Sequence, residues 1–273
     1  MIILFSYSLS IAEENHNKTS DFDESWLKAV VSIEITSEPG VETSVGTGFI
    51  VQSPNHHLLL ITAKHVVLNK KGNIRNNLAI RINDKSGQSI LYKSIDIENS
   101  NLGNWFLSKT SDLACKFILR KETSDILSIP LSMFLPTSEL NVGAPLMVLG
   151  FPMGLRSDEF AVPIVRKAMA AKVDPDIVII DGLSFPGNSG GPVVYKPAIK
   201  FGKGINSAVI NEQRLIGLVY ESINYVDTAI SQQTKRARIT FEENSGLSNV
   251  IPADEILKLI KRKDVLETDK KIQ

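Results

Sequence analysis

Short runs of apolar residues, separated by clusters of Pro, Gly, Asn and Asp, recur along the chain from about residue 25 to residue 250. The runs are rich in Val, Ile and Leu, which favours β-strands over helices. Many short strands between frequent turn signals are typical of an all-β barrel or sandwich. Helical periodicity is nearly absent from this part of the chain. Representative runs are VGTGFIVQS, HLLLITAKHVV, LACKFIL, DIVIIDG and RLIGLVY.

One segment near the C-terminus has the periodicity of an amphipathic helix instead. In residues 252–263, Ile256, Leu257, Leu259 and Ile260 form a single apolar face. Acidic residues occupy the first turn and basic residues the last, which complements the helix dipole. We therefore predict a C-terminal helix that packs against the β structure.

The length of the chain and one connecting segment predict its division. A chain of 273 residues suits one large domain or two of about 100 to 150 residues. The segment 129–143 carries two prolines and is typical of a connection between two β domains. We place the boundary near residue 138. The expected units are a leader (1–24), a first β domain (25–138), a second β domain (139–250) and a helix with a tail (251–273).

The first twelve residues, MIILFSYSLSIA, are apolar and precede a polar stretch. Ser10 and Ala12 are small residues at the two positions that a signal peptidase inspects. No Lys or Arg precedes the apolar part. We predict a signal peptide and export to the periplasm or the exterior, and a cytoplasmic location if the stretch is not a signal.

Composition excludes several classes of partner. The 30 Lys and Arg residues balance the 30 Asp and Glu residues, so no overall charge favours nucleic acid or an anionic membrane. No run of eighteen apolar residues could span a bilayer. One cysteine and four histidines offer neither a disulfide nor a set of zinc ligands, and we expect no metal or other cofactor. Cys115 lies in an apolar run, which indicates a buried small side chain.

A glycine-rich stretch, SFPGNSGGPVV (184–194), places Ser189 among three glycines. The local pattern G-x-S-x-G also fits the nucleophile of α/β-hydrolases, but that fold needs a histidine after the serine. All four histidines of this chain precede Ser189. The subtilisin order of Asp, His and Ser has no matching motif before His65. The order that remains is His, Asp, Ser.

Two other residues are candidates for chemistry with this serine. His65 ends the run LLLITAKHVV, whereas His56 and His57 lie about 26 Å away along the strand, in what we expect to be a solvated turn. Asp112 stands at the start of the apolar run LACKFIL, where a buried charge would need a partner. His65 and Asp112 are therefore the candidate base and acid.

Five motifs together resemble a known family. They are GTGFIV (46–51), ITAKHVV (61–67), SDLA (111–114), VLGFPMGL (148–155) and GNSGGPVV (187–194). In order and spacing they resemble the trypsin-like serine peptidases of the chymotrypsin fold, most closely the bacterial branch of the high-temperature-requirement proteases. The resemblance covers about residues 27–262. It implies two six-stranded antiparallel β-barrels with the site between them. The 23 residues after Val250 are too few for the PDZ domain that such proteases carry, so we expect none.

The resemblance implies a role for each matched residue. His65 would be the general base, Asp112 would orient it, and Ser189 would be the nucleophile. The turn of Gly187, Asn188 and Ser189 would supply the backbone amides of an oxyanion hole. Asn188 stands where digestive relatives have Asp, so we do not expect activation by a newly formed N-terminal ammonium.

Substrate contacts are predicted from two further places. Leu183, six residues before Ser189, stands where trypsin-like specificity puts an acid, which predicts a small or medium apolar side chain at the cleaved residue. The strand LIGLVYES should offer Tyr220, Glu221 and Ser222 as an edge for antiparallel pairing with an extended substrate.

Two long segments, 196–213 and 222–248, are predicted as loops beside the cleft that either gate it or only elaborate the surface. The basic residues Lys235, Arg236 and Arg238 are interpreted as a solvated loop face. The overall hypothesis is a cofactor-free serine endopeptidase acting on polypeptides. Two alternatives stay open: a peptide-binding module on a protease scaffold that does not cut, and a hydrolase of small esters.

Overall fold

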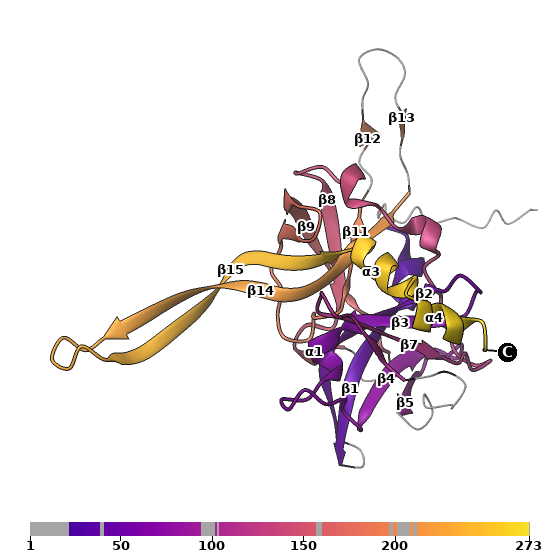
Figure 1. Ribbon diagram of the computed structural model, residues 1–273, viewed down its shortest axis with the longest axis horizontal. Helices are drawn as coiled ribbons and strands as arrows, with labels where there is room; N and C mark the ends of the chain where they lie inside the picture. Colours follow the sequence, from indigo (N-terminus) through magenta and orange to yellow (C-terminus); the bar gives the residue numbers. More distant parts are fainter. Residues whose placement is uncertain are drawn as a thin grey trace, which may run out of the picture.

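Antiparallel strands are the predominant secondary structure of the computed structural model, and they form two groups that lie side by side (Figure 1). The prediction of an all-β fold with helical structure at the C-terminus is confirmed. The structure describes residues 22–38, 41–93, 102, 104–156, 160–196, 199–200, 208–209 and 212–272.

The first group is a seven-stranded sheet in the order β5-β4-β1-β2-β3-β7-β6. Strands β3 and β7 are buried along their whole length, as their apolar runs require. Within the described residues no ladder joins β5 to β6, and the short seventh strand β6 covers the outer edge of β7. This group therefore differs from the six-stranded closed barrel that was expected. The strands are β1 (Val30–Glu38), β2 (Val41–Gln52), β3 (Leu58–Ala63), β4 (Leu78–Asn83), β5 (Ser89–Lys93), β6 (Phe106–Leu107) and β7 (Leu113–Ile118).

The second group is the closed six-stranded barrel that was expected, in the order β10-β15-β14-β11-β8-β9. Its interior is filled by branched aliphatic side chains such as Val148, Ile180 and Val193. A separate pair, β12 (Ile199–Lys200) with β13 (Ala208–Val209), stands outside the barrel. The barrel strands are β8 (Pro145–Gly150), β9 (Ile164–Val173), β10 (Val178–Asp181), β11 (Pro192–Tyr195), β14 (Arg214–Ile230) and β15 (Ala237–Pro252).

The predicted C-terminal helix is present but ends earlier and is followed by a second helix. Arg262 is in an extended conformation, and its guanidinium donates to the Leu107 carbonyl at 2.7 Å, which fixes the break. The apolar face is buried as expected. No helix among the described residues is long and apolar enough to cross a bilayer. The helices are α1 (Lys64–Val67), α3 (Ala253–Ile260) and α4 (Lys263–Asp269), with 3-10 turns η1 (Glu24–Ala29), η3 (Leu131–Met133), η4 (Thr137–Glu139) and η5 (Pro152–Gly154).

Asp269, at the end of α4, anchors this helix to the hairpin between β2 and β3. Its fully buried carboxylate accepts hydrogen bonds from Ser53 Oγ at 2.5 Å and from the backbone and side-chain N–H groups of Asn55 at 3.1 Å. His57 Nδ1 lies 2.8 Å from the same carboxylate. The prediction of a solvated turn is therefore wrong for His57, whereas His56 is exposed. The reason is a partner more than two hundred residues away, which no local pattern indicates.

Replacing Asp269 with Ala is expected to lower the free energy of unfolding by about 3 kcal/mol, because the buried Ser53 hydroxyl and the part-buried donors of Asn55 and His57 would lose their acceptor. The matched control is Asp264→Ala in the same helix. Asp264 is mostly exposed and pairs with Arg262, so its removal should cost about 1 kcal/mol or less. Urea unfolding of both variants measures the difference, and equal losses would contradict the anchoring role of Asp269.

Candidate active site

The neighbouring strands β3 and β7 bring His65 and Asp112 together. Ala63 pairs with Leu113 across the two strands, so the residues just after β3 lie beside those just before β7. His65 sits in α1, the single helical turn that follows β3, and Asp112 directly precedes β7. The local pairing of two buried apolar strands therefore positions both polar side chains at one end of the first sheet.

His65 and Asp112 form a two-point contact. His65 Nδ1 lies 2.5 Å from Asp112 Oδ2, and the backbone N–H of His65 donates to Asp112 Oδ1 at 2.9 Å. Burial on its own would raise the pKa of Asp112, but the hydrogen bonds from His65 and the positive charges of His65 and Lys64 lower it below its ordinary value. The carboxylate is therefore ionised near neutral pH and can hold the imidazole in one orientation.

Ser189 lies in the turn between β10 and β11, against the end of β3. A side chain at the next residue, Gly190, would come within 2.3 Å of Thr62 Oγ1 and 3.0 Å of Ala63 N. The turn is thus pressed onto the same strand end that leads into His65. Ser189 Oγ donates to the Tyr220 carbonyl at 3.2 Å, and within the described chain no hydrogen bond joins Ser189 to His65.

Tyr220 on β14 lies next to Ser189. Burial, and then the negative charges of Glu221 and Asp112, raise the pKa of its phenol. The phenol is therefore neutral near neutral pH.

The turn before Ser189 carries two backbone N–H groups that have no acceptor among the described residues, those of Gly187 and Ser189. Gly187 has φ +97°, and a Cβ there would lie 2.3 Å from the Phe151 carbonyl, so only glycine fits. Two free N–H groups two residues apart form a concavity suited to an anionic oxygen. The N–H of Asn188 donates to the Phe185 carbonyl at 2.9 Å, so the inclusion of Asn188 in the predicted oxyanion hole is wrong.

All four carbonyls of this turn are held by hydrogen bonds, which fixes the direction of the free N–H groups. In a trans peptide the C=O and N–H point in opposite directions. The Pro186 carbonyl accepts from Met153 N–H at 2.5 Å, which directs the N–H of Gly187. The Asn188 carbonyl accepts from Gly191 N–H at 2.8 Å, which directs the N–H of Ser189. The peptides therefore cannot rotate without breaking these bonds.

The two remaining carbonyls are held by Thr47, a buried residue of β2 in the other sheet. Thr47 Oγ1 donates to the Gly187 carbonyl at 2.6 Å, and Thr47 N–H donates to the Ser189 carbonyl at 2.9 Å. The sequence analysis missed this role. The only signal was that Thr47 lies between two glycines of a recognised motif, and close backbone approach is a usual reason for such glycines.

The other predicted site residues are distributed as follows. Leu183 is 42% exposed, on the segment between β10 and Ser189. Ser222 continues β14 beyond Tyr220, whereas the Glu221 carboxylate accepts from Asn249 Nδ2 on β15 at 3.2 Å. Cys115 is fully buried and burial raises the pKa of its thiol, which confirms the prediction of a buried small side chain.

Comparisons with known proteins bear on this site. The family described as "Trypsin-like peptidase domain" matches residues 46–196. No curated protein sequence matches the chain. Similar solved structures include the HtrA-type protease AlgW, in a substituted form, with a tripeptide (16% identity, TM-score 0.48, 85% of this chain and 58% of that one). Another is the same protease with a decapeptide (15% identity, TM-score 0.48, 88% and 64%). The chain therefore spans less than two thirds of either solved chain.

Proposed function

Because the chain belongs to the trypsin-like peptidase family, whose domain covers residues 46–196, we propose that it is a serine endopeptidase that cleaves polypeptides through an acyl-enzyme. One observation carries the proposal: the N–H groups of Gly187 and Ser189 are unpaired and held in fixed directions beside the Ser189 hydroxyl. Fixed donors at this place suit the charge that develops on a carbonyl oxygen under attack.

In the proposed reaction, Ser189 Oγ attacks the substrate carbonyl while His65 Nε2 accepts its proton. The carbonyl oxygen becomes an oxyanion and is stabilised by the N–H groups of Gly187 and Ser189. His65 then donates the proton to the leaving amine as the peptide C–N bond breaks. Water, deprotonated by His65, attacks the ester carbonyl, and the ester C–O bond then breaks as His65 returns the proton to Ser189 Oγ. Throughout, Asp112 Oδ2 accepts a hydrogen bond from the Nδ1–H of His65 and stabilises the imidazolium.

A second candidate, a peptide-binding module that does not cut, is favoured by one observation. Ser189 Oγ donates to the Tyr220 carbonyl instead of to His65. In structures without substrate, however, catalytic hydrogen bonds are often long or misaligned and form only in the complex. A rotation about the Cα–Cβ bond of Ser189 changes its partner without moving the backbone. The fixed oxyanion donors are not needed for binding alone, so we favour the peptidase.

Labelling with a fluorophosphonate tests the proposal. We expect one adduct per folded chain, attached to Ser189 and located by mass spectrometry, because the probe requires an activated serine next to oxyanion donors. Ser189→Ala should remove the label. Ser184→Ala, in the same loop, should keep it. Absence of label on folded wild-type protein would support the binding module. A label without cleavage of an unfolded protein substrate would support the small-ester hydrolase.

Three predictions from the sequence remain proposals. Leu183 still favours a small or medium apolar side chain at the cleaved residue, since a cationic side chain would find no carboxylate there. The division near residue 138 is retained as a boundary between two domains. The stretch proposed as an export signal lies outside the described residues. Export therefore remains a proposal that rests on the sequence of residues 1–12 alone.

A further inference from the structure

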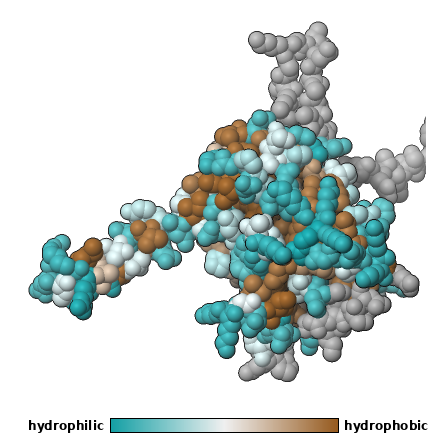
Figure 2. Space-filling view, viewed as in Figure 1, coloured by the Kyte–Doolittle hydropathy of each residue, from teal (hydrophilic) through white to brown (hydrophobic). Residues whose placement is uncertain are grey.

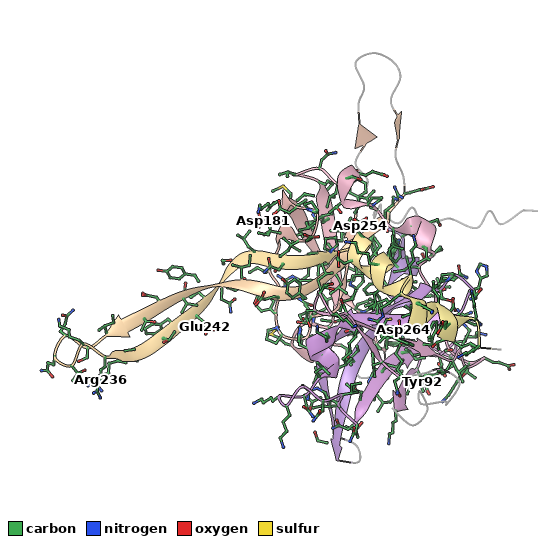
Figure 3. All side chains as sticks on the ribbon, in the orientation of Figure 1. Tyr92, Asp181, Arg236, Glu242, Asp254 and Asp264 are labelled. Atoms are coloured by element: carbon green, nitrogen blue, oxygen red, sulfur yellow. The ribbon has the colours of Figure 1, made fainter. Side chains whose placement is uncertain are left out.

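Strands β14 and β15 continue beyond the barrel as a two-stranded ribbon, residues 223–244, which we call the arm. It projects from the barrel in Figure 1, and Figure 2 shows it standing clear of the body. Figure 3 shows Glu242 along the arm and Arg236 at its tip. The sequence analysis expected a loop here, and this is corrected to paired strands. The three basic residues at the tip are exposed, as expected.

One edge of β14 is open along the arm. On one side β15 pairs with β14 from the barrel to Ile230. On the other side β11 pairs with β14 only as far as Leu218, and the bonds between Val219 and the glycines after Ser189 complete that contact. From Tyr220 outward, no described strand pairs with this second edge. The open edge therefore begins at Ser189 and runs along the whole arm.

The N–H and C=O groups of successive residues alternate between the two edges of β14, which identifies those that face the open edge. Ile223 O accepts from Ser245 Oγ, and Ser231 N–H donates to the Arg236 carbonyl, so from Glu221 outward, beyond the register shift at Tyr220, the odd-numbered residues of β14 face β15. Tyr220 has the opposite parity, and its carbonyl faces Ser189. Successive residues of a strand direct their N–H and C=O groups to opposite edges. Ser222, Asn224 and Val226 thus present donors and acceptors to the open edge.

One face of the arm carries an unprotected apolar row. Cross-strand pairing puts Tyr225, Phe241 and Ile239 on the same face, and they are 62%, 53% and 56% exposed. An isolated two-stranded ribbon is marginally stable in water, and a third strand with an apolar side chain on this face would bury part of the row.

We propose that the arm binds the substrate segment that precedes the cleaved bond, as a third antiparallel strand along the open edge of β14. The inference rests on the proposed function and adds the substrate class: extended polypeptides with at least about seven residues before the cleaved bond. The continuity of the edge with Ser189 favours substrate over a second copy of the chain as the occupant. With the cleaved residue opposite Tyr220, the sixth residue before the bond lies opposite Tyr225 on the apolar face, so an apolar side chain is preferred there.

The first experiment varies the substrate. Fluorogenic peptides identical around the cleaved bond carry three, six or nine residues before it. We expect kcat/KM to rise about tenfold or more from the shortest to the longest, since each added pair of hydrogen bonds contributes modestly. N-methylation of the fifth or the seventh residue before the bond should remove the gain, because those amides face β14. N-methylation of the sixth, whose amide points away, should retain it.

The second experiment varies the arm. Val226→Pro removes one N–H from the open edge and leaves the bonds to β15 in place, whereas Val226→Ala keeps that N–H. We expect the rise in kcat/KM with the nine-residue peptide to be lost in Val226→Pro and kept in Val226→Ala. Both variants should cleave the three-residue peptide as the wild type does.

A binding measurement separates this inference from the proposed function. The anisotropy of the labelled nine-residue peptide is followed with Ser189→Ala, with and without Val226→Pro. Length-dependent binding without any cleavage by the wild type would overturn the peptidase and keep the arm as a peptide-binding edge. Cleavage that is independent of peptide length and N-methylation would overturn the arm. A dimer in sedimentation that Val226→Pro dissociates, with no change in peptide cleavage, would also overturn it, because a second copy would then occupy the edge.

Discussion

Replacing Asp112 with Asn is expected to lower kcat about 10⁴-fold while the fold is retained. The Asn oxygen can still accept the backbone N–H of His65, which now donates to the carboxylate at 2.9 Å. The Asn amide, however, would donate to His65 Nδ1. The remaining imidazole proton would then sit on Nε2, the nitrogen that has to accept the proton of Ser189. Steady-state kinetics on an unstructured peptide measures the loss.

The control for this variant is Asp125→Asn. Asp125 is a surface carboxylate paired with Lys28 at 2.9 Å, so its change to Asn should alter neither kcat nor the melting temperature appreciably. Circular dichroism of both variants checks that the fold is kept. If Asp112→Asn kept a kcat within tenfold of the wild type, Asp112 would not be the residue that orients His65.

Replacing Gly187 with Ala is expected to lower kcat by about 10² to 10³, equivalent to about 3 to 4 kcal/mol of transition-state stabilisation. The new Cβ would approach the Phe151 carbonyl to 2.3 Å and Met153 N to 3.0 Å. Both belong to backbone and cannot swing aside. The turn would have to move, and the N–H of Gly187 would leave its position. The rate of fluorophosphonate labelling should fall in parallel with kcat.

Gly72→Ala is the matched control for Gly187→Ala. Gly72 also has a left-handed backbone, with φ +79°, but no heavy atom lies within 4 Å of a Cβ placed there. Gly72→Ala should lose about 1 kcal/mol of stability from backbone strain alone, and Gly187→Ala should lose more because its Cβ also clashes with backbone atoms. Only Gly187→Ala should lose activity. Equal activity in the two variants would mean that the turn does not supply an oxyanion donor.

The parts of the fold and site that could be predicted are those encoded by short segments. The apolar runs of β3 and β7 predicted buried strands, and the motifs that end or begin them contain His65 and Asp112. Gly46 illustrates why such motifs predict structure. A Cβ there would come within 2.7 Å of both methyl groups of Val66, so the glycine indicates a close contact. Residue type and local geometry point to the same place in these cases.

What could not be predicted depends on contacts between distant segments. The hydrogen bond from Thr47 to Gly187 joins residues 140 apart, and that from Ser53 to Asp269 joins residues 216 apart. A threonine hydroxyl or an aspartate carries no local mark of such a partner. The arm was predicted as a loop because it is longer than a minimal protease of this type requires, and only the pairing between β14 and β15 gives it a regular structure.

Because Thr47 holds the turn around Ser189, the second half of the molecule depends on the folding of the first half. The turn around Ser189 takes its shape only when a residue of β2, made early in synthesis, is packed against it. A chain that is incomplete, or whose first half has come apart, has the serine but not the working arrangement around it. If Ser189 acts as proposed, a molecule whose first half is unfolded would lack the fixed oxyanion donors and would therefore be inactive.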